Sequence, residues 1–281
     1  MNNLMDGLSV SLKIRNEIQL EIEENKYTPS LVVIQVGNDK ASNLYIKNKL
    51  KASSDVGIKV EHIKFETNAK EEVIINKIKE LNLKSDVNGI LVQLPLPKGF
   101  NEGNIINSID PVKDVDGLTY ENVGNLVLEN DCLVSCTPLG VIELLKAYNV
   151  KLEGKHAVIV GRSNLVGKPL IQLLLKHDAT VSICHSKSSN IKNITKTADI
   201  LIVAAGHANL ITKDMVKDKA IVIDVGINKE NNILCGDVNF NDVKKKASLI
   251  TPVPGGVGPM TVACLIKNIL KAYKLQNDIK K

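Results

Sequence analysis

The chain has 281 residues, of which 44% are hydrophobic and 24% charged, as is typical of a globular protein. This composition excludes a disordered chain, a collagen and a small disulfide-stapled scaffold. The 36 basic and 31 acidic residues leave a formal net charge of +5, which is mild for this length and lacks the dense basic cluster of a nucleic-acid binder. We therefore expect no nucleic-acid partner.

The length predicts two domains, because a domain averages about 150 residues. No stretch reaches the roughly 18 apolar residues of a membrane span, and the amino terminus lacks the pattern of a secretory signal, so we expect no membrane association. The cysteines are odd in number, scattered and outside C-x-x-C pairs, which favours a reducing cytoplasm and argues against disulfides or a bound metal. They are Cys132, Cys136, Cys184, Cys235 and Cys264.

The first half of the chain alternates β-branched runs with helical patterns, which predicts parallel βαβ units. The expected strands cover 31–36, about 58–65 and 89–94. Asn38 or Asp39 can cap the helix that follows the first strand. Two further helices are indicated by apolar residues spaced three or four apart: Ile14, Ile18 and Ile22 in one, and Ile74, Ile78 and Leu81 in the other.

The second half resumes this alternation after 110–134, which we interpret as a loop-rich connection. Thr137 and Pro138 are expected to begin a helix, with Thr137 as its cap. The expected strands cover 156–160, 180–184, 200–204, 220–224 and 248–250, and a last helix runs from about 260 to 274. The sequence thus predicts an α/β fold of two domains joined near residue 138, the second a Rossmann-like doubly wound parallel sheet.

A glycine-rich turn follows the first strand of the second half. Gly161 ends that strand and Gly167 lies near the start of the next helix, where a pyrophosphate can approach a helix amino terminus. The usual spacing is G-x-G-x-x-G, but Ser163 replaces the second glycine here and the third is displaced. A tight turn into a packed helix is the plainer interpretation.

The end of the next strand bears on the choice of cofactor. NAD sites usually place a carboxylate there, whereas this chain has Ser186 and Lys187, with Arg162 in the glycine-rich turn. Hydroxyl and cationic groups suit a 2′-phosphate and favour NADP over NAD, although Lys187 also fits a solvent-facing charge. Gly226, just past a later strand and before Ile227, permits close approach to a ligand or forms a simple turn.

Ser42, Tyr45 and Lys49 are spaced three and four residues apart, so they share one face of the helix after the first strand. A tyrosine beside a lysine can orient the amine and shield it from water, and burial lowers a lysine pKa toward the range for proton transfer near neutrality. Alone, this spacing is more typical of an exposed amphipathic pair. Gln93, at the carboxyl end of an apolar strand, is a candidate ligand or lysine partner.

Two loops complete the candidate groups. Asp116 lies in the irregular connection, where a carboxylate can accept paired hydrogen bonds from an amidine-like heterocycle, or where Asp-Gly simply forms a turn. The segment Thr251–Pro259 is rich in prolines and glycines directly before the last helix. Rigid φ at proline and permissive φ at glycine shape the backbone, so we interpret this segment as an interdomain lip over a ligand.

Taken in order, these motifs resemble the bifunctional methylenetetrahydrofolate dehydrogenase/cyclohydrolase family over essentially the whole chain. The matching segments are Val36-Gly37, Ala41-Ser42, Tyr45-Ile46-x-x-Lys49, Val92–Pro97, Lys113–Gly117, Cys136–Pro138, Gly161–Ser163, Gly236–Val238 and Pro254–Thr261. Ser135 and Ser188 depart from the proline and threonine common in the family. The resemblance implies oxidation of 5,10-methylenetetrahydrofolate with NADP, then hydrolysis of the methenyl cation to 10-formyltetrahydrofolate, in one-carbon metabolism.

The resemblance also implies roles for individual residues. Lys49 is the general acid and base, Gln93 holds it, Tyr45 stacks on the folate rings, and Asp116 binds the pterin edge. The folate site adds Ser42, Val92, Leu94, Pro254, Gly255 and Gly256, and the cofactor site consists of Gly161, Arg162, Ser163, Ser186 and Ile227. The implied domains are 1–139 with 259–281 for folate and 140–258 for NADP, with the active-site cleft between them, in a homodimer.

Other functions fit parts of the pattern. In a short-chain dehydrogenase the glycine-rich turn precedes the Tyr-x-x-x-Lys pair, the reverse of the order found here. A non-catalytic dinucleotide sensor would need the second half but not Lys49, Gln93 and Asp116 together. A member with only one of the two activities is a further alternative. The principal interpretation requires the Lys49 amine to meet the nicotinamide across a shared gap.

Overall fold

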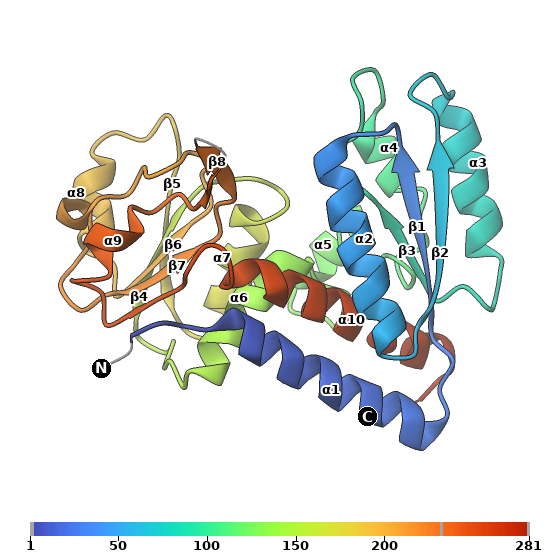
Figure 1. The fold of residues 1–281 in the computed structure, drawn as a ribbon, viewed down its shortest axis with the longest axis horizontal. Helices are drawn as coiled ribbons and strands as arrows, with labels where there is room; N and C mark the ends of the chain where they lie inside the picture. Colours follow the sequence, from blue (N-terminus) through green and yellow to red (C-terminus); the bar gives the residue numbers. More distant parts are fainter. Residues whose placement is uncertain (1–2, 231–232, 280–281) are drawn as a thin grey trace. The chain divides into compact units, whose positions relative to one another are not determined.

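The computed structural model describes residues 3–230 and 233–279, and the chain divides into two compact α/β units (Figure 1). The first unit comprises Lys13–Ser135 and Cys264–Lys281, and the second comprises Met1–Leu12 and Cys136–Ala263. The amino-terminal segment thus groups with the second unit. Which unit binds which ligand stays a prediction at this point.

A three-stranded parallel sheet forms the centre of the first unit, in the order β2-β1-β3. The strand that comes first in the chain therefore lies in the middle, and its Leu31 is opposite Val60 of β2 and Gly89 of β3. The strands are β1 (Ser30–Val36), β2 (Lys59–Phe65) and β3 (Gly89–Val92). The helices within the unit are α2 (Lys40–Asp55), α3 (Glu71–Asn82), α4 (Glu102–Ile106) and α5 (Tyr120–Val127).

Helix α3 covers one face of this sheet because its apolar side chains recur on one side. Ile74, Ile78 and Leu81 are fully buried, as predicted, and belong to one apolar cluster with Ile34 and Ile90 of the strands. Burying each such side chain stabilises the fold by about 1.5–3 kcal/mol. Two long helices, α1 (Gly7–Asn25) and α10 (Val257–Gln276), contribute residues to both units.

The second unit is built on a five-stranded parallel sheet in the order β10-β7-β6-β4-β5. Its strands are β4 (His156–Val160), β5 (Thr180–Cys184), β6 (Ile200–Val203), β7 (Ile221–Asp224) and β10 (Leu249–Ile250). The first and third strands of the unit, β4 and β6, are neighbours, and the chain reverses its direction across the sheet between them. This doubly wound order confirms the predicted Rossmann-like sheet, and ligands of such sheets bind at the reversal point.

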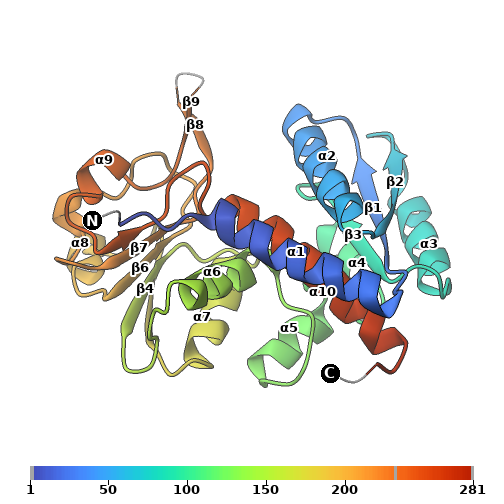
Figure 2. The same cartoon turned by 60° about the horizontal axis from the view of Figure 1, so that its bottom comes forward.

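Helices and a hairpin complete the second unit. The helical elements are α6 (Cys136–Ala147), α7 (Gly167–Leu175), α8 (Ile191–Thr195), α9 (Phe240–Val243) and the 3₁₀ turn η1 (Lys213–Met215). An antiparallel hairpin of β8 (Asn228–Glu230) and β9 (Ile233–Cys235) projects from the unit (Figure 2). Across the described residues of both units, the helices are too short or too polar to cross a membrane.

Two local predictions were wrong. The connection 110–134 is loop-rich, as expected, but also contains the helix α5, which was not predicted and whose amino-terminal cap is Thr119. Thr137 is not a helix cap, because α6 already begins at Cys136. Strand β3 ends at Val92 rather than at residue 94, and the hairpin β8–β9 was not predicted at all.

Candidate functional site

The Lys49 side chain is buried in the middle of α2 and bonded to Gln93. Asp39 caps the start of this helix by accepting a hydrogen bond from the backbone N–H of Ser42 at 2.8 Å. Lys49 is only 9% exposed, and its Nζ donates to Oε1 of Gln93 at 3.1 Å. The structure therefore brings together two predicted site residues that are 44 positions apart in the chain.

Gln93 is held in place by the backbone on both sides. Its own N–H donates to the carbonyl of Ile34 at 2.8 Å, which continues the pairing between β1 and β3. Its side-chain Nε2 donates to the carbonyl of Leu94 at 2.6 Å, so its oxygen is the atom presented to Lys49. Because β1 and β3 are the first and third strands of the unit, Gln93 lies at the reversal point of this sheet.

Tyr45 and Ser42 share the helix face of Lys49, as predicted from their spacing. Tyr45 lies one turn before Lys49 and is 41% exposed, which leaves part of its ring open for stacking. Burial of the rest raises the pKa of its hydroxyl. The partner that the structure gives to Lys49 is Gln93, so the predicted orienting role falls to the amide and Tyr45 offers an aromatic surface.

Asp116 lies half-buried in a loop that is fixed on both sides. On its amino-terminal side, Lys113 is buried, and its Nζ donates to three backbone carbonyls at the end of α3, at 3.3, 2.9 and 2.6 Å. Such a cation favourably meets the free carbonyls of a helix end. Burial lowers the pKa of this ammonium group. The lysine therefore ties the Asp116 loop to α3.

Asp114 anchors the other side of the same loop. Its buried Oδ2 accepts hydrogen bonds from the N–H groups of Leu118 and Thr119, both at 2.7 Å, and from Nδ2 of Asn122 at 3.0 Å. Burial raises the pKa of this carboxyl group. From α10, the buried amide of Asn268 donates to the carbonyls of Val115 and Val134, both at 2.8 Å.

Sequence reasoning assigned no role to these supporting residues. Lys113 and Asp114 lie in the Lys113–Gly117 motif, so their position beside Asp116 was a usable signal. Asn268 gave no signal, because its partner Val115 lies 153 positions away. Asp116 itself is thus presented by a rigid frame, while its own side chain remains partly accessible.

The glycine-rich turn of the second unit is closely packed against the neighbouring strand end. Gly161 has a φ of +130°, and a Cβ atom there would lie 2.1 Å from the carbonyl oxygen of Ala204, just after β6. A Cβ atom at Gly167 would lie 2.2 Å from the carbonyl oxygen of Gly161. Both positions therefore require glycine. The turn lies at the reversal point between β4 and β6, where doubly wound sheets bind dinucleotides.

The groups around this turn are cationic or hydroxylic. Arg162 and Ser163 are exposed, and the Ser163 hydroxyl oxygen accepts a hydrogen bond from the N–H of Val166 at 3.2 Å. After β5, Ser186 and Lys187 are also exposed. Hydroxyls and positive charges fit the 2′-phosphate of NADP, so this donor set fits that cofactor. Ile227, after β7, is 50% exposed and available for apolar contact.

The proline- and glycine-rich segment connects β10 to α10 in the second unit. Gly255 has a φ of +101°, and its carbonyl accepts a hydrogen bond from the N–H of Leu8 at 3.1 Å. A Cβ atom at Gly256 would lie 2.5 Å from the carbonyl oxygen of Pro252. These contacts give the segment around Pro254 a defined backbone shape, as the sequence suggested. Val92 and Leu94, the other predicted folate residues, flank Gln93 and are buried and half-buried.

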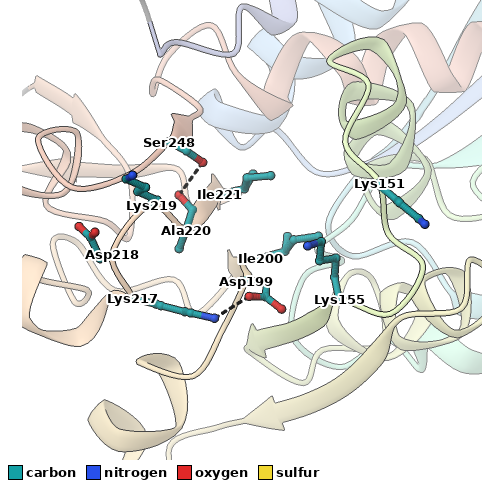
Figure 3. A pocket seen from close by; sticks show the side chains of 10 residues that line it. All are labelled: Lys151, Lys155, Asp199, Ile200, Lys217, Asp218, Lys219, Ala220, Ile221 and Ser248. Carbon is teal, nitrogen blue, oxygen red and sulfur yellow. Dashed lines mark hydrogen bonds and ion pairs between the residues drawn. The ribbon is translucent and has the colours of Figure 1, made fainter.

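A separate pocket lies at the opposite, amino-terminal edge of the second sheet (Figure 3). It has a volume of about 150 Å³ and contains four lysines and two aspartates. Asp199 accepts from the N–H of His156 at 3.0 Å and pairs with Lys217 at 2.6 Å, and the bond from Lys217 lowers the Asp199 pKa. In these contacts the charged groups bind one another and the backbone at the start of the strands. Parallel sheets bind ligands at the carboxyl ends of their strands, so this pocket is not part of the candidate site.

Comparisons with known proteins cover both units. Residues 5–116 match the family model described as tetrahydrofolate dehydrogenase/cyclohydrolase, catalytic domain, and residues 135–277 match the NAD(P)-binding domain of the same family. The bifunctional protein FolD of Hydrogenobaculum sp. (strain Y04AAS1) is 52% identical over 275 residues, which cover 97% of this chain and 99% of that protein.

Two solved structures are similar along their whole length. The bifunctional FolD enzyme of Campylobacter jejuni has a TM-score of 0.95 and 46% identity, covering 97% of this chain and 98% of that one. The methylenetetrahydrofolate dehydrogenase-cyclohydrolase of Trypanosoma brucei, complexed with NADP cofactor and inhibitor, has a TM-score of 0.93 and 35% identity, covering 99% and 98%.

Proposed function

We infer that this chain, which belongs to the tetrahydrofolate dehydrogenase/cyclohydrolase family, uses Lys49 and Gln93 as the catalytic centre of the family's two reactions. It is an NADP-dependent methylenetetrahydrofolate dehydrogenase and methenyltetrahydrofolate cyclohydrolase. The observation that carries the proposal is the hydrogen bond of 3.1 Å between the buried Lys49 ammonium and the Gln93 amide oxygen.

The hydrolytic step is the one that needs proton transfer. Addition of water to the methenyl carbon releases one proton, and collapse to the formyl group moves the hydroxyl proton to the departing ring nitrogen. Lys49 is placed to exchange these protons, because its amine is buried and oriented by a fixed amide. Gln93 is the positioning residue, since its side-chain amide donates to the carbonyl of Leu94 and its backbone N–H donates to the carbonyl of Ile34.

The dehydrogenation step depends mainly on positioning. NADP, when bound, supplies the hydride acceptor. Gly161 and Ser163 would bind its pyrophosphate through the turn before α7, and Arg162 and Ser186 would bind its 2′-phosphate. Ile227 would contact the cofactor through its exposed side chain. The exposed hydroxyl and cationic groups at this turn support the assignment.

The remaining proposed residues bind the folate. Tyr45 would stack on the fused rings, and Asp116 would accept paired hydrogen bonds from the amino-pyrimidine edge of the pterin. Ser42 shares the Tyr45 helix face. Backbone and apolar contacts would come from Val92, Leu94, Pro254, Gly255 and Gly256. The partial exposure of Tyr45 and Asp116 on fixed elements supports these roles.

A spectroscopic assay tests both activities of the proposed centre. The purified protein is mixed with methylenetetrahydrofolate and either NADP or NAD, and NADPH formation is followed together with methenyl absorbance. We expect reduction of NADP and loss of the methenyl signal faster than the uncatalysed background. Accumulation of methenyltetrahydrofolate without enzymatic loss would show that hydrolysis, and hence the role of Lys49, was wrongly assigned.

Assembly and location are further parts of the proposal. The family resemblance supports a homodimer. The dispersed cysteines support a cytoplasmic location, because they fit a reducing compartment. Light scattering coupled to size-exclusion chromatography tests the dimer, for which the expected mass is twice the 30.6 kDa of one chain.

A further inference from the structure

Two buried carboxylates occupy the carboxyl edge of the second sheet, outside the residues assigned so far. Asp224 is the last residue of β7 and is 3% exposed, whereas Asp237 follows the hairpin β8–β9 and is fully buried. Burying two like charges close together is unfavourable unless their oxygens are well satisfied. Their hydrogen bonds therefore indicate what the charges hold.

Asp237 binds the loop that follows β6. Its Oδ2 accepts from the N–H groups of Ala205 and Gly206 at 2.6 and 2.9 Å, and its Oδ1 accepts from the N–H of His207 at 2.9 Å. Oδ1 also accepts from Nδ2 of Asn228 at 2.8 Å. Three successive backbone N–H groups around one anion form a concave nest, and the loop conformation depends on the anion at its centre.

The loop held by Asp237 adjoins the glycine-rich turn. Ala204, directly before the three bound N–H groups, contacts Gly161 so closely that no Cβ atom fits between them. The loop and the turn follow β6 and β4, the two strands at the reversal point. A change in the loop would therefore be transmitted to the backbone that receives the cofactor.

Asp224 connects the backbone around Asp237 to the segment that carries Ile227. Its Oδ1 accepts from the N–H groups of Gly226 and Asp237 at 3.0 and 2.9 Å, and its Oδ2 accepts from the N–H of Val238 at 2.9 Å. The N–H of Asp224 in turn donates to the Thr251 hydroxyl oxygen at 2.7 Å. Asp224 thus fixes the segments on both sides of the hairpin.

The packing of two glycines against the two carboxylates is reciprocal. A Cβ atom at Gly226 would lie 2.3 Å from Asp237 Oδ1, and a Cβ atom at Gly236 would lie 1.8 Å from Asp224 Oδ2. Each carboxylate therefore occupies space that a side chain would need on the other segment. The arrangement fixes the base of the hairpin and the position of Ile227 between Gly226 and β8.

We propose that Asp237 is a positioning residue for NADP, holding residues 205–207 and, through Asp224, the Gly226–Ile227 segment in the conformation that receives the cofactor. This inference rests on the cofactor residues of the proposed function. Asn at position 237 would not replace the charge, because each carboxylate oxygen accepts from two donors. An NH₂ group in place of Oδ2 would face the backbone N–H groups of Ala205 and Gly206, and one in place of Oδ1 would face the backbone N–H of His207.

The test compares Asp237→Asn with Asp218→Asn, an exposed aspartate at the opposite edge of the same sheet. For Asp237→Asn we expect the Kd for NADP, measured by fluorescence titration, to rise at least ten-fold, with the KM for the folate substrate unchanged within two-fold. In the protein without cofactor, hydrogen exchange at the amides of 205–207 should become at least ten-fold faster. Asp218→Asn should leave all three quantities unchanged.

A second variant covers the outcome that Asp237→Asn does not fold. Gly206 has a φ of +69° and open space where a Cβ atom would lie, so Gly206→Ala strains the loop backbone without touching the carboxylate. We expect a Kd for NADP raised several-fold. Unchanged affinity and exchange in the folded variants would overturn the inference alone, whereas failure of the wild-type protein to bind NADP would overturn it together with the proposed cofactor site.

Discussion

Replacing Lys49 by methionine removes the ammonium group from the proposed catalytic centre while keeping an unbranched side chain. The position is 9% exposed, so the methionine side chain stays buried. Gln93 Oε1 loses its donor at a half-buried position, and an unsatisfied acceptor there costs at most about 1–3 kcal/mol of unfolding free energy. A domain with an ordinary stability of about 5–15 kcal/mol tolerates that loss, so we expect the variant to fold.

The expected loss of activity is much larger than the loss of stability. General acid–base catalysis contributes about 10²–10⁴-fold to a rate. This factor corresponds to roughly 3–5 kcal/mol of transition-state stabilisation. We therefore expect Lys49→Met to hydrolyse methenyltetrahydrofolate at least 10²-fold more slowly than the wild-type enzyme, with the Kd for NADP unchanged within two-fold.

The assay follows the decay of methenyl absorbance without NADP, corrected for uncatalysed hydrolysis, and a thermal unfolding curve shows that the variant is folded. Lys47→Met is the matched control, because Lys47 is an exposed lysine of the same helix outside the face of Tyr45 and Lys49. It should retain the wild-type rate. Hydrolysis by folded Lys49→Met at the wild-type rate would refute the assigned role.

Three further changes test the cofactor turn, the Asp116 loop and the buried carboxylates. Arg162→Ala should raise the Kd for NADP about ten-fold and leave that for NAD within two-fold in fluorescence titrations, because only NADP carries the 2′-phosphate; equal losses would place Arg162 elsewhere. Lys113→Met should lower the free energy of urea unfolding by about 2–4 kcal/mol, since three carbonyls at the end of α3 lose a buried donor, and an unchanged midpoint would contradict this. Burial raises the pKa of Asp224 from 3.8 to about 6, and the nearby charge of Asp237 acts in the same direction. Three backbone hydrogen bonds oppose this rise but do not cancel it. The protonated form therefore stabilises the native state below about pH 4 by roughly 3 kcal/mol, and this contribution is lost as the pH rises through 6. Asp224→Asn should lack this slope between pH 4 and 7, while the neighbouring titratable groups Asp237 and Cys235 are present in both proteins; identical slopes would refute the shift.

The sequence predicted the architecture well because the strands of both sheets are short apolar runs, and most of them alternate with helices. Gln93 could be predicted as a ligand residue or a lysine partner because ligand groups gather beyond the carboxyl ends of parallel strands, a rule that applies from sequence alone. The family resemblance named Lys49 as its partner. Their contact at 3.1 Å agrees with that prediction. The residues that support the site were harder to predict from the sequence. Asn268, for example, lies on a helix 153 positions away from Val115, to which it donates a hydrogen bond.

Helix α5 shows why periodicity failed in the connection 110–134. Its polar Asn122 is buried at 4% exposure, where its amide binds Asp114, whereas its apolar Tyr120 and Val127 are 75% and 52% exposed. The buried face of α5 combines this amide with the apolar Leu126, which is 7% exposed, so it is not a continuous hydrophobic stripe. The helix is held partly by a polar network around a buried carboxylate, and hydrophobic periodicity gives no sign of such a network.

The two sheets share one topological feature, although different ligands are proposed for them. In each, the first and third strands are neighbours, and the candidate residue follows one of them: Gln93 after β3, and Gly161 after β4. Parallel pairing brings those chain ends to one edge but leaves the loops beyond them free to vary. In the second unit the buried carboxylate of Asp237 restricts that freedom for the loop after β6, by binding three successive backbone N–H groups. In the first unit Asp114 does the same for the loop that carries Asp116, by binding two successive N–H groups. Strand order thus determines where Gln93 and the glycine-rich turn lie, and the buried charges determine the conformation of these two loops, so replacing them should weaken ligand binding before it disrupts the sheets.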